Sequence, residues 1–218
     1  MGHGFKALAL TAVLAIVMLG FPAAGHSTPA YLVDTGPGPD NVDIAQTPSA
    51  LLSVDQWLGF RFDTGNSVRI GGVEGWMSVI PGGQGYGRLA LYEDDNNRPG
   101  TLLFSDSFFG AVTDPTGLYS DADWLGSLNL DWKIKSGSYW ITFEADARPS
   151  GLIAGFILPS PNPVAVEAYR PCCLGADWVN ASLGLGVRVT KRTPEPGTFA
   201  LLGLGLAGMG LSRRRTAN

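Results

Sequence analysis

Short stretches in which apolar and polar residues alternate account for about half of residues 55–190. A period of two places the apolar side chains on one face of an extended strand, so each stretch predicts a half-buried β-strand. The stretches are Trp57–Phe62, Val68–Val79, Arg88–Glu93, Leu102–Phe109, Leu125–Trp132, Tyr139–Glu144, Leu152–Leu158, Val164–Tyr169 and Leu183–Thr190. Gly, Pro, Asp and Asn cluster between them, as turns require. About nine such strands predict an all-β domain, an antiparallel β-sandwich with a jelly-roll-like arrangement.

The first 25 residues have the organisation of a secretory signal peptide. Lys6 precedes an uncharged apolar run, Ala7–Phe21, and small residues follow at 23–25. This order predicts an N-terminal signal helix, export by the Sec machinery and cleavage near Gly25.

A second apolar segment, Thr198–Leu211, lies close to the C-terminus and is followed by Arg213, Arg214 and Arg215. As a helix, this segment would span about 21 Å, less than the ~30 Å hydrocarbon core of a bilayer. Snorkelling arginines and local thinning of the bilayer can make up the difference. The segment therefore predicts a short transmembrane helix in the inner membrane, with the arginines on the cytoplasmic side.

The order of features in this tail resembles the PEP-CTERM sorting signal. Pro194, Glu195 and Pro196 precede the apolar segment, and the arginine cluster ends three residues before the terminus. The resemblance implies a Gram-negative bacterium and processing by a membrane-embedded exosortase that recognises the tripeptide. It also implies anchoring in the inner membrane facing the periplasm, then a place at the cell surface or in the extracellular matrix, in association with exopolysaccharide and biofilm. The same tail is described as the C-terminal domain of certain ice-binding proteins.

These features divide the chain into five expected parts. They are a signal peptide (1–25), a loose N-terminal arm rich in Pro, Gly, Ala and Asp (26–54), the β-sandwich (55–190), a linker with the Pro-Glu-Pro motif (191–197), and the membrane segment with its basic tail (198–218). Within the arm, residues 30–33 could add an edge strand.

The histidine content excludes several classes of enzyme. The chain has only His3, inside the signal, and His26, at the expected new terminus. A Ser-His-Asp triad or a histidine zinc site is therefore not available in the outer domain. A glycan hydrolase needs only two carboxyl groups, and this alternative stays open. We expect a protein that is not an enzyme and has no cofactor.

The charge of the outer domain argues against nucleic acid as a partner. Lys6 and the three C-terminal arginines lie outside residues 26–196, which leaves 11 basic residues against 19 acidic ones and a net charge of −8. Binding of nucleic acid would need clustered Lys and Arg on one face, and no such cluster is visible.

Aromatic residues suggest a carbohydrate-binding module as an alternative function. Trp140 shares its strand face with Thr142 and Glu144 rather than with Ile141, so it is a candidate for an outer, sugar-binding surface. Trp132, between Asp131 and Lys133, is a weaker candidate. Ice binding is a further alternative, although no series of alternating threonines is present.

Two local features leave alternatives open. Asp94, Asp95 and Asn97 carry hard oxygen ligands and are weak candidates for Ca²⁺, but their spacing does not match an EF-hand and a solvated turn is the simpler interpretation. Cys172 and Cys173 are adjacent. They are candidates for a vicinal disulfide, an interchain bond or two reduced thiols.

Overall fold

The structure is a computed structural model that describes residues 30–39, 49–80, 82–111, 122–145, 151–171 and 176–192. All regular elements in these ranges are β-strands, which confirms the all-β class. The same ranges contain no helix of the length and apolar character needed to cross a bilayer. The predicted signal helix (1–25) and transmembrane helix (198–211) lie outside the described residues.

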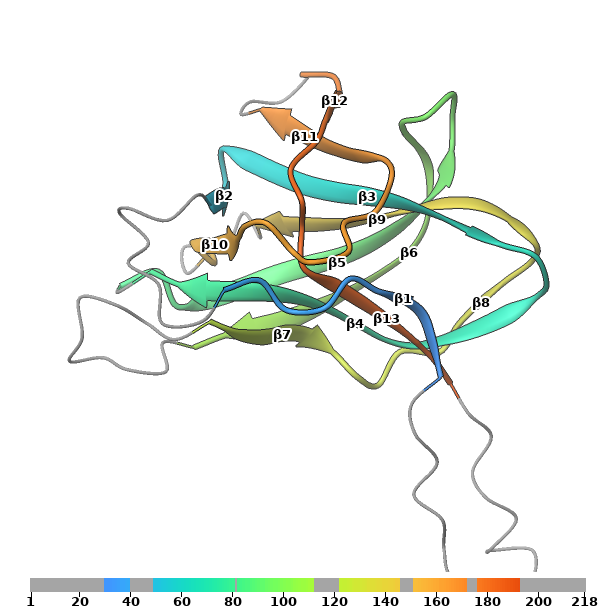
Figure 1. Ribbon diagram of the computed structural model, residues 1–218, viewed down its shortest axis with the longest axis horizontal. Coiled ribbons are helices and arrows are strands. Elements are labelled where there is room, and N and C mark those ends of the chain that lie inside the picture. The colour runs from blue at the N-terminus through green and yellow to red at the C-terminus, as the bar shows by residue number, and fades with distance from the viewer. Residues whose placement is uncertain are drawn as a thin grey trace, which may run out of the picture. The chain divides into compact units, whose positions relative to one another are not determined.

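One antiparallel sheet has six strands in the order β12-β11-β3-β9-β5-β6 (Figure 1). Its strands are β3 (Gln56–Thr64), β5 (Gly85–Asp94), β6 (Pro99–Gly110), β9 (Gly137–Ala145), β11 (Glu167–Pro171) and β12 (Val179–Ala181). Strands β3, β9 and β5 form its centre, so their side chains alternate between the interior and the outer face.

A second antiparallel sheet has seven strands, with β1-β13-β4-β10-β2 in order and both β7 and β8 paired with β4. Its strands are β1 (Tyr31–Asp34), β2 (Ser49–Leu52), β4 (Val68–Val79), β7 (Asp123–Ser127), β8 (Trp132–Ile134), β10 (Ala154–Ile157) and β13 (Val187–Lys191). The expected edge strand near residues 30–33 is therefore present as β1. The segment expected to be a loose arm also supplies β2 at the other edge of the sheet.

The two sheets share one hydrophobic core. Phe60, Leu89 and Phe143 of the six-stranded sheet lie in the same buried cluster as Met77 and Phe156 of the seven-stranded sheet. All five side chains are fully buried. This shared core is what two sheets packed face to face produce, as in the predicted β-sandwich.

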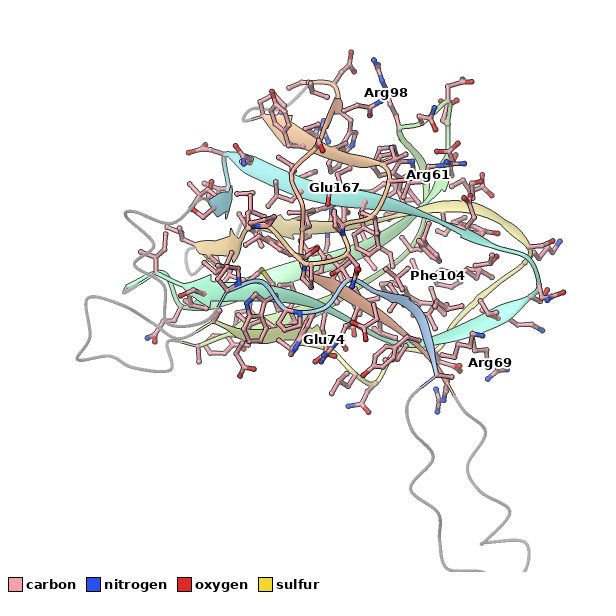
Figure 2. All side chains as sticks on the ribbon, in the orientation of Figure 1. Arg61, Arg69, Glu74, Arg98, Phe104 and Glu167 are labelled. Atoms are coloured by element: carbon pink, nitrogen blue, oxygen red, sulfur yellow. The ribbon has the colours of Figure 1, made fainter. Side chains whose placement is uncertain are left out.

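One predicted strand begins later than its pattern suggests. The alternation from Leu183 to Thr190 predicts a single strand, but β13 starts only at Val187. The buried carboxylate of Glu167 accepts hydrogen bonds from the backbone N–H groups of Leu183, Gly184 and Leu185. Figure 2 shows Glu167 close to the segment that leads into β13. The carboxylate satisfies these donors, so this segment needs no partner strand.

Candidate functional site

Trp140 lies on the predicted face of its strand but is not exposed. Its side chain has no exposed area and packs with Ala168 and Trp178 in a small cluster outside the main core. Its indole Nε1 donates a hydrogen bond of 2.7 Å to Asp94 Oδ1. The expectation of an exposed ligand surface at Trp140 is therefore wrong, because Trp178 comes from another part of the chain to cover it.

Trp132 is also buried, and the expectation that it is exposed is wrong as well. The residue is 6% exposed, belongs to the core between the sheets, and stacks on Phe104 with 6.0 Å between ring centroids. Its neighbours Asp131 and Lys133 are exposed. Alternation along β8 thus turns the polar neighbours outward and the indole inward.

The three weak Ca²⁺ candidates, Asp94, Asp95 and Asn97, lie at the end of β5 and in the turn that follows it. Asn96 and Asn97 have φ angles of 53° and 62°, which is the left-handed pair that a two-residue hairpin turn requires. Asp94 Oδ1 contacts the indole of Trp140 and the Arg61 guanidinium at 3.2 Å, whereas Asp95 accepts a bond from the Asn96 side chain. Within the described ranges, no three His, Cys, Asp or Glu side chains converge as metal ligands. These contacts favour the turn interpretation.

The remaining predicted site residues cannot be placed. Cys172 and Cys173, the tripeptide Pro194–Pro196 and the cluster Arg213–Arg215 lie outside the described residues. Their roles stay predictions from the sequence.

The structure instead gathers aromatic and arginine side chains on the outer face of the six-stranded sheet. Five residues make up this aromatic–arginine face: Trp57, Tyr86, Arg88, Phe109 and Arg170. Arg170 pairs with Trp57 across β11 and β3, and Tyr86 pairs with Phe109 across β5 and β6. Arg88 lies two positions after Tyr86 on β5, and two positions correspond to the same face of a strand.

The two rings at one end of this face are exposed. Tyr86 is 39% exposed and Phe109 is 53% exposed. Their ring centroids are 5.0 Å apart in an edge-to-face arrangement, a favourable geometry for an aromatic pair. Because both rings are already exposed, a ligand can contact their apolar area without any rearrangement of the core.

A buried carboxylate organises the middle of the face. Glu144 on β9 has no exposed area, and its Oε2 accepts hydrogen bonds from Nε of Arg88, at 2.7 Å, and from Nη2 of the same guanidinium. Its Oε1 accepts bonds from the hydroxyls of Tyr92 at 2.8 Å and Thr142 at 2.7 Å. A buried charge needs such pairing. The two hydroxyls hold the Glu144 carboxylate, and its two hydrogen bonds with the guanidinium orient the Arg88 side chain.

The same carboxylate keeps Tyr92 protonated. Burial raises the pKa of the Tyr92 hydroxyl, and the charge and hydrogen bond of Glu144 raise it further. Tyr92 therefore remains a hydrogen-bond donor to Glu144 throughout the physiological range of pH.

Trp57 lies between two cations. The guanidinium carbon of Arg170 is 5.0 Å from the centroid of the Trp57 ring, and that of Arg88 is 5.8 Å away. Cation–π attraction favours both contacts. Trp57 was not among the site residues predicted from the sequence, in which Trp57–Phe62 predicts a strand. The signal was available, since Trp57 alternates onto the face of Gly59 and Arg61, away from the apolar side chains of Leu58 and Phe60.

The face can bind a ligand that offers apolar surface and hydrogen-bond acceptors together. From β11 to β6 the sheet order includes four steps between neighbouring strands, so the face extends about 19 Å across the strands. Aromatic rings at one end and a guanidinium at the other suit an extended polar polymer better than a single small molecule.

Comparison with known proteins identifies the tail. A family model described as the PEP-CTERM protein-sorting motif matches residues 192–215. No curated protein and no solved structure matches the chain. The matched motif implies processing by an exosortase and a place in the cell envelope or at the surface. The chain therefore carries a PEP-CTERM protein-sorting motif at residues 192–215, which supports an exported surface protein targeted to exosortase.

Proposed function

We propose that this is a non-catalytic protein of the cell surface or extracellular matrix, whose β-sandwich binds exopolysaccharide through the aromatic–arginine face. The Sec machinery exports the chain, and the apolar tail holds it in the inner membrane with the sandwich in the periplasm. Exosortase then processes the tail at the Pro-Glu-Pro motif, and the sandwich stays with the matrix by binding its polysaccharide. The sorting motif at residues 192–215 supports the first part of this proposal.

One observation carries the binding part: the exposed Tyr86–Phe109 ring pair lies on the same sheet face as Arg88 and Arg170. Aromatic rings stack on the apolar faces of sugars, and guanidinium groups donate hydrogen bonds to sugar oxygens. Two rings with 39% and 53% exposure already have area available for such stacking. A polymer can contact both ends of a face that is about 19 Å wide.

The contacts of Glu144 support a non-catalytic role for this face. A glycosidase of the usual kind needs two carboxyl groups that flank the scissile bond. Glu144 is fully buried, and both of its oxygens accept hydrogen bonds from neighbouring side chains. Its task is to orient Arg88, and it is not available as a general acid or nucleophile.

The test compares exposed aromatic residues on the two sheets. Full-length protein in mild detergent would be run by native affinity electrophoresis through gels containing exopolysaccharide from the source bacterium. We expect Tyr86→Ala and Phe109→Ala to lose most of the retardation, because they remove the exposed rings. Tyr31→Ala is the matched control, since Tyr31 is 36% exposed and lies on β1 of the other sheet. Equal retardation of all variants, or no retardation of the wild type, contradicts the proposal.

A second candidate function is a glycan hydrolase, and one observation favours it. Burial raises the pKa of Glu74 on β4, and the charge of Asp123 raises it further, against the opposing effect of Arg188. A raised pKa is what a glycosidase general acid needs, and Asp123 is a second carboxyl whose charge acts on Glu74. Release of reducing sugars from the exopolysaccharide by the wild type, abolished in Glu74→Gln and in Asp123→Asn, would favour this function over simple binding.

A further inference from the structure

Most arginines of the described ranges are neutralised by an acidic side chain. The ion pairs join Arg61 to Asp63 and Asp94, Arg69 and Arg192 to Asp131, Arg88 to Glu144, and Arg188 to Asp34. Among the described residues, Arg98 and Arg170 have no such partner.

Arg170 differs from Arg98 in being held in place. Its Nε donates a hydrogen bond of 2.7 Å to the carbonyl oxygen of Ala176, and its guanidinium lies over the ring of Trp57. These contacts fix the plane of the guanidinium on a sheet face and use only one of its nitrogens. The two terminal nitrogens have no acceptor among the described residues, so they can donate to a ligand as a fork.

Arg170 forms no ion pair with a carboxylate of the described residues. The neighbouring Arg88 is compensated by Glu144, which is buried and fully hydrogen-bonded. Among the described residues of the aromatic–arginine face, the charge of Arg170 is therefore the one that no carboxylate balances. A planar, fixed guanidinium without a counterion matches a carboxylate, which accepts two parallel hydrogen bonds.

We infer that Arg170 binds the carboxylate of an acidic polysaccharide, a polymer with uronate-type sugars, laid across the aromatic–arginine face. This inference rests on the proposed function and adds the chemical class of the ligand. Tyr86 and Phe109 contact the apolar faces of the sugars at one end of the face, and Arg170 selects the charged substituent at the other. A neutral polymer of the same shape leaves the Arg170 guanidinium without its partner.

The experiment uses two probes with the same sugar backbone, polygalacturonate and its fully methyl-esterified form, in which each carboxylate is replaced by a neutral methyl ester. Dissociation constants of the full-length protein for both probes would be measured at low salt, with folding of each variant checked by thermal unfolding. We expect the acid to bind more tightly than the ester, and added salt to reduce the difference. Arg170→Gln should weaken binding of the acid by about tenfold or more and leave binding of the ester unchanged.

Arg98→Gln is the matched control, because Arg98 is exposed, also lacks an ion pair among the described residues, and lies in the turn at the far end of β5 (Figure 2). It should change the affinity for the acid less than twofold, whereas Arg170→Lys, which keeps the charge and loses the fork, should be intermediate. If Arg170→Gln does not fold and Arg170→Lys does, a loss of affinity for the acid in Arg170→Lys supports the inference, and an unchanged affinity contradicts it.

The outcomes separate this inference from the proposed function. Equal binding of acid and ester, with both lost in Tyr86→Ala, overturns the role of Arg170 and leaves polysaccharide binding in place. Equal losses in Arg170→Gln and Arg98→Gln show nonspecific attraction and also overturn the inference. Failure of the wild type to bind either probe overturns the inference. The proposed function is then tested separately by affinity electrophoresis, in which the native exopolysaccharide should still retard the wild type.

Discussion

Arg88 on β5 and Glu144 on β9 form a charged pair directly across neighbouring strands, with a hydrogen bond of 2.7 Å from Nε to Oε2. The carboxylate has no exposed area, whereas the arginine side chain is 40% exposed. The Glu144 carboxylate is therefore buried beneath the outer face of the sheet, and the Arg88 side chain that pairs with it reaches the solvent. This contact explains why a fully buried carboxylate is tolerated near the end of the central strand β9.

The first prediction concerns this pair. Arg88→Met leaves the Glu144 carboxylate buried with only two hydroxyl donors, so we expect the free energy of unfolding to fall by about 2 kcal/mol. The loss should be smaller than the ~3–5 kcal/mol of a fully buried pair, because solvent already screens Arg88. Urea denaturation would measure it. The double variant Arg88→Met/Glu144→Met should be more stable than Arg88→Met alone. If the stability losses of Arg88→Met and Glu144→Met add up to the loss of the double variant, the two residues are not coupled.

The second prediction concerns Glu167, which is 2% exposed. Its carboxylate oxygens accept hydrogen bonds from the backbone nitrogens of Gly184, at 2.6 Å, and Leu185, at 2.7 Å. Glu167→Gln removes the charge and turns an NH₂ group toward those donors. We expect a loss of about 3 kcal/mol in the free energy of unfolding, because hydrogen bonds to a charged acceptor are strong. Glu93→Gln, at an exposed position of β5, is the control and should be nearly neutral. Similar stability of both variants would refute this role.

The third prediction concerns pH. Burial raises the pKa of Glu74 above its ordinary value of 4.5, so the folded protein holds this proton more tightly than the unfolded chain does. The resulting stabilisation is fully present below pH 4.5 and is lost as the pH rises through the raised pKa. Glu74→Gln cannot ionise and escapes this loss. The variant should therefore gain stability relative to the wild type as the pH rises above about 4.5. A stability difference that stays constant with pH would contradict the raised pKa.

The fourth prediction separates two parts of the sorting tail. Glu195→Ala should leave insertion intact and block processing, because the Pro-Glu-Pro segment is the part that the exosortase recognises. Full-length, membrane-bound protein should then accumulate in a fractionated immunoblot, whereas Thr193→Ala, beside the tripeptide, should behave like the wild type.

The arginines of the tail should act through charge. Replacing Arg213, Arg214 and Arg215 by Asn should release unprocessed protein into the periplasm or medium, because each arginine opposes translocation by about 2.5–3.5 kcal/mol at the bilayer centre. The same immunoblot reports this release. If Glu195→Ala were processed and distributed like the wild type, the tripeptide would have no role in sorting.

Local order in the sequence was enough for the central strands and for the sorting motif, but not for every strand, because the predicted strand Leu125–Trp132 is interrupted between β7 and β8. Alternation at Val68–Val79 predicted β4 with its observed bounds, and the same rule placed Trp140 on the face of Thr142 and Glu144. The sorting motif could be read directly, because its tripeptide, apolar run and basic cluster are recognised by their order along the chain. These features depend on neighbours within a few residues.

Only the tertiary structure decided which side chains meet and which stay exposed. Trp178 covers Trp140 although 38 positions separate them, and Glu167 binds the backbone at Leu185, which delays the start of β13. Period-two alternation distinguishes the two faces of a strand, but it does not show what packs on the outer one. Exposure at Tyr86 and burial at Trp140 follow from contacts between distant segments, and these contacts form only when the sheets assemble.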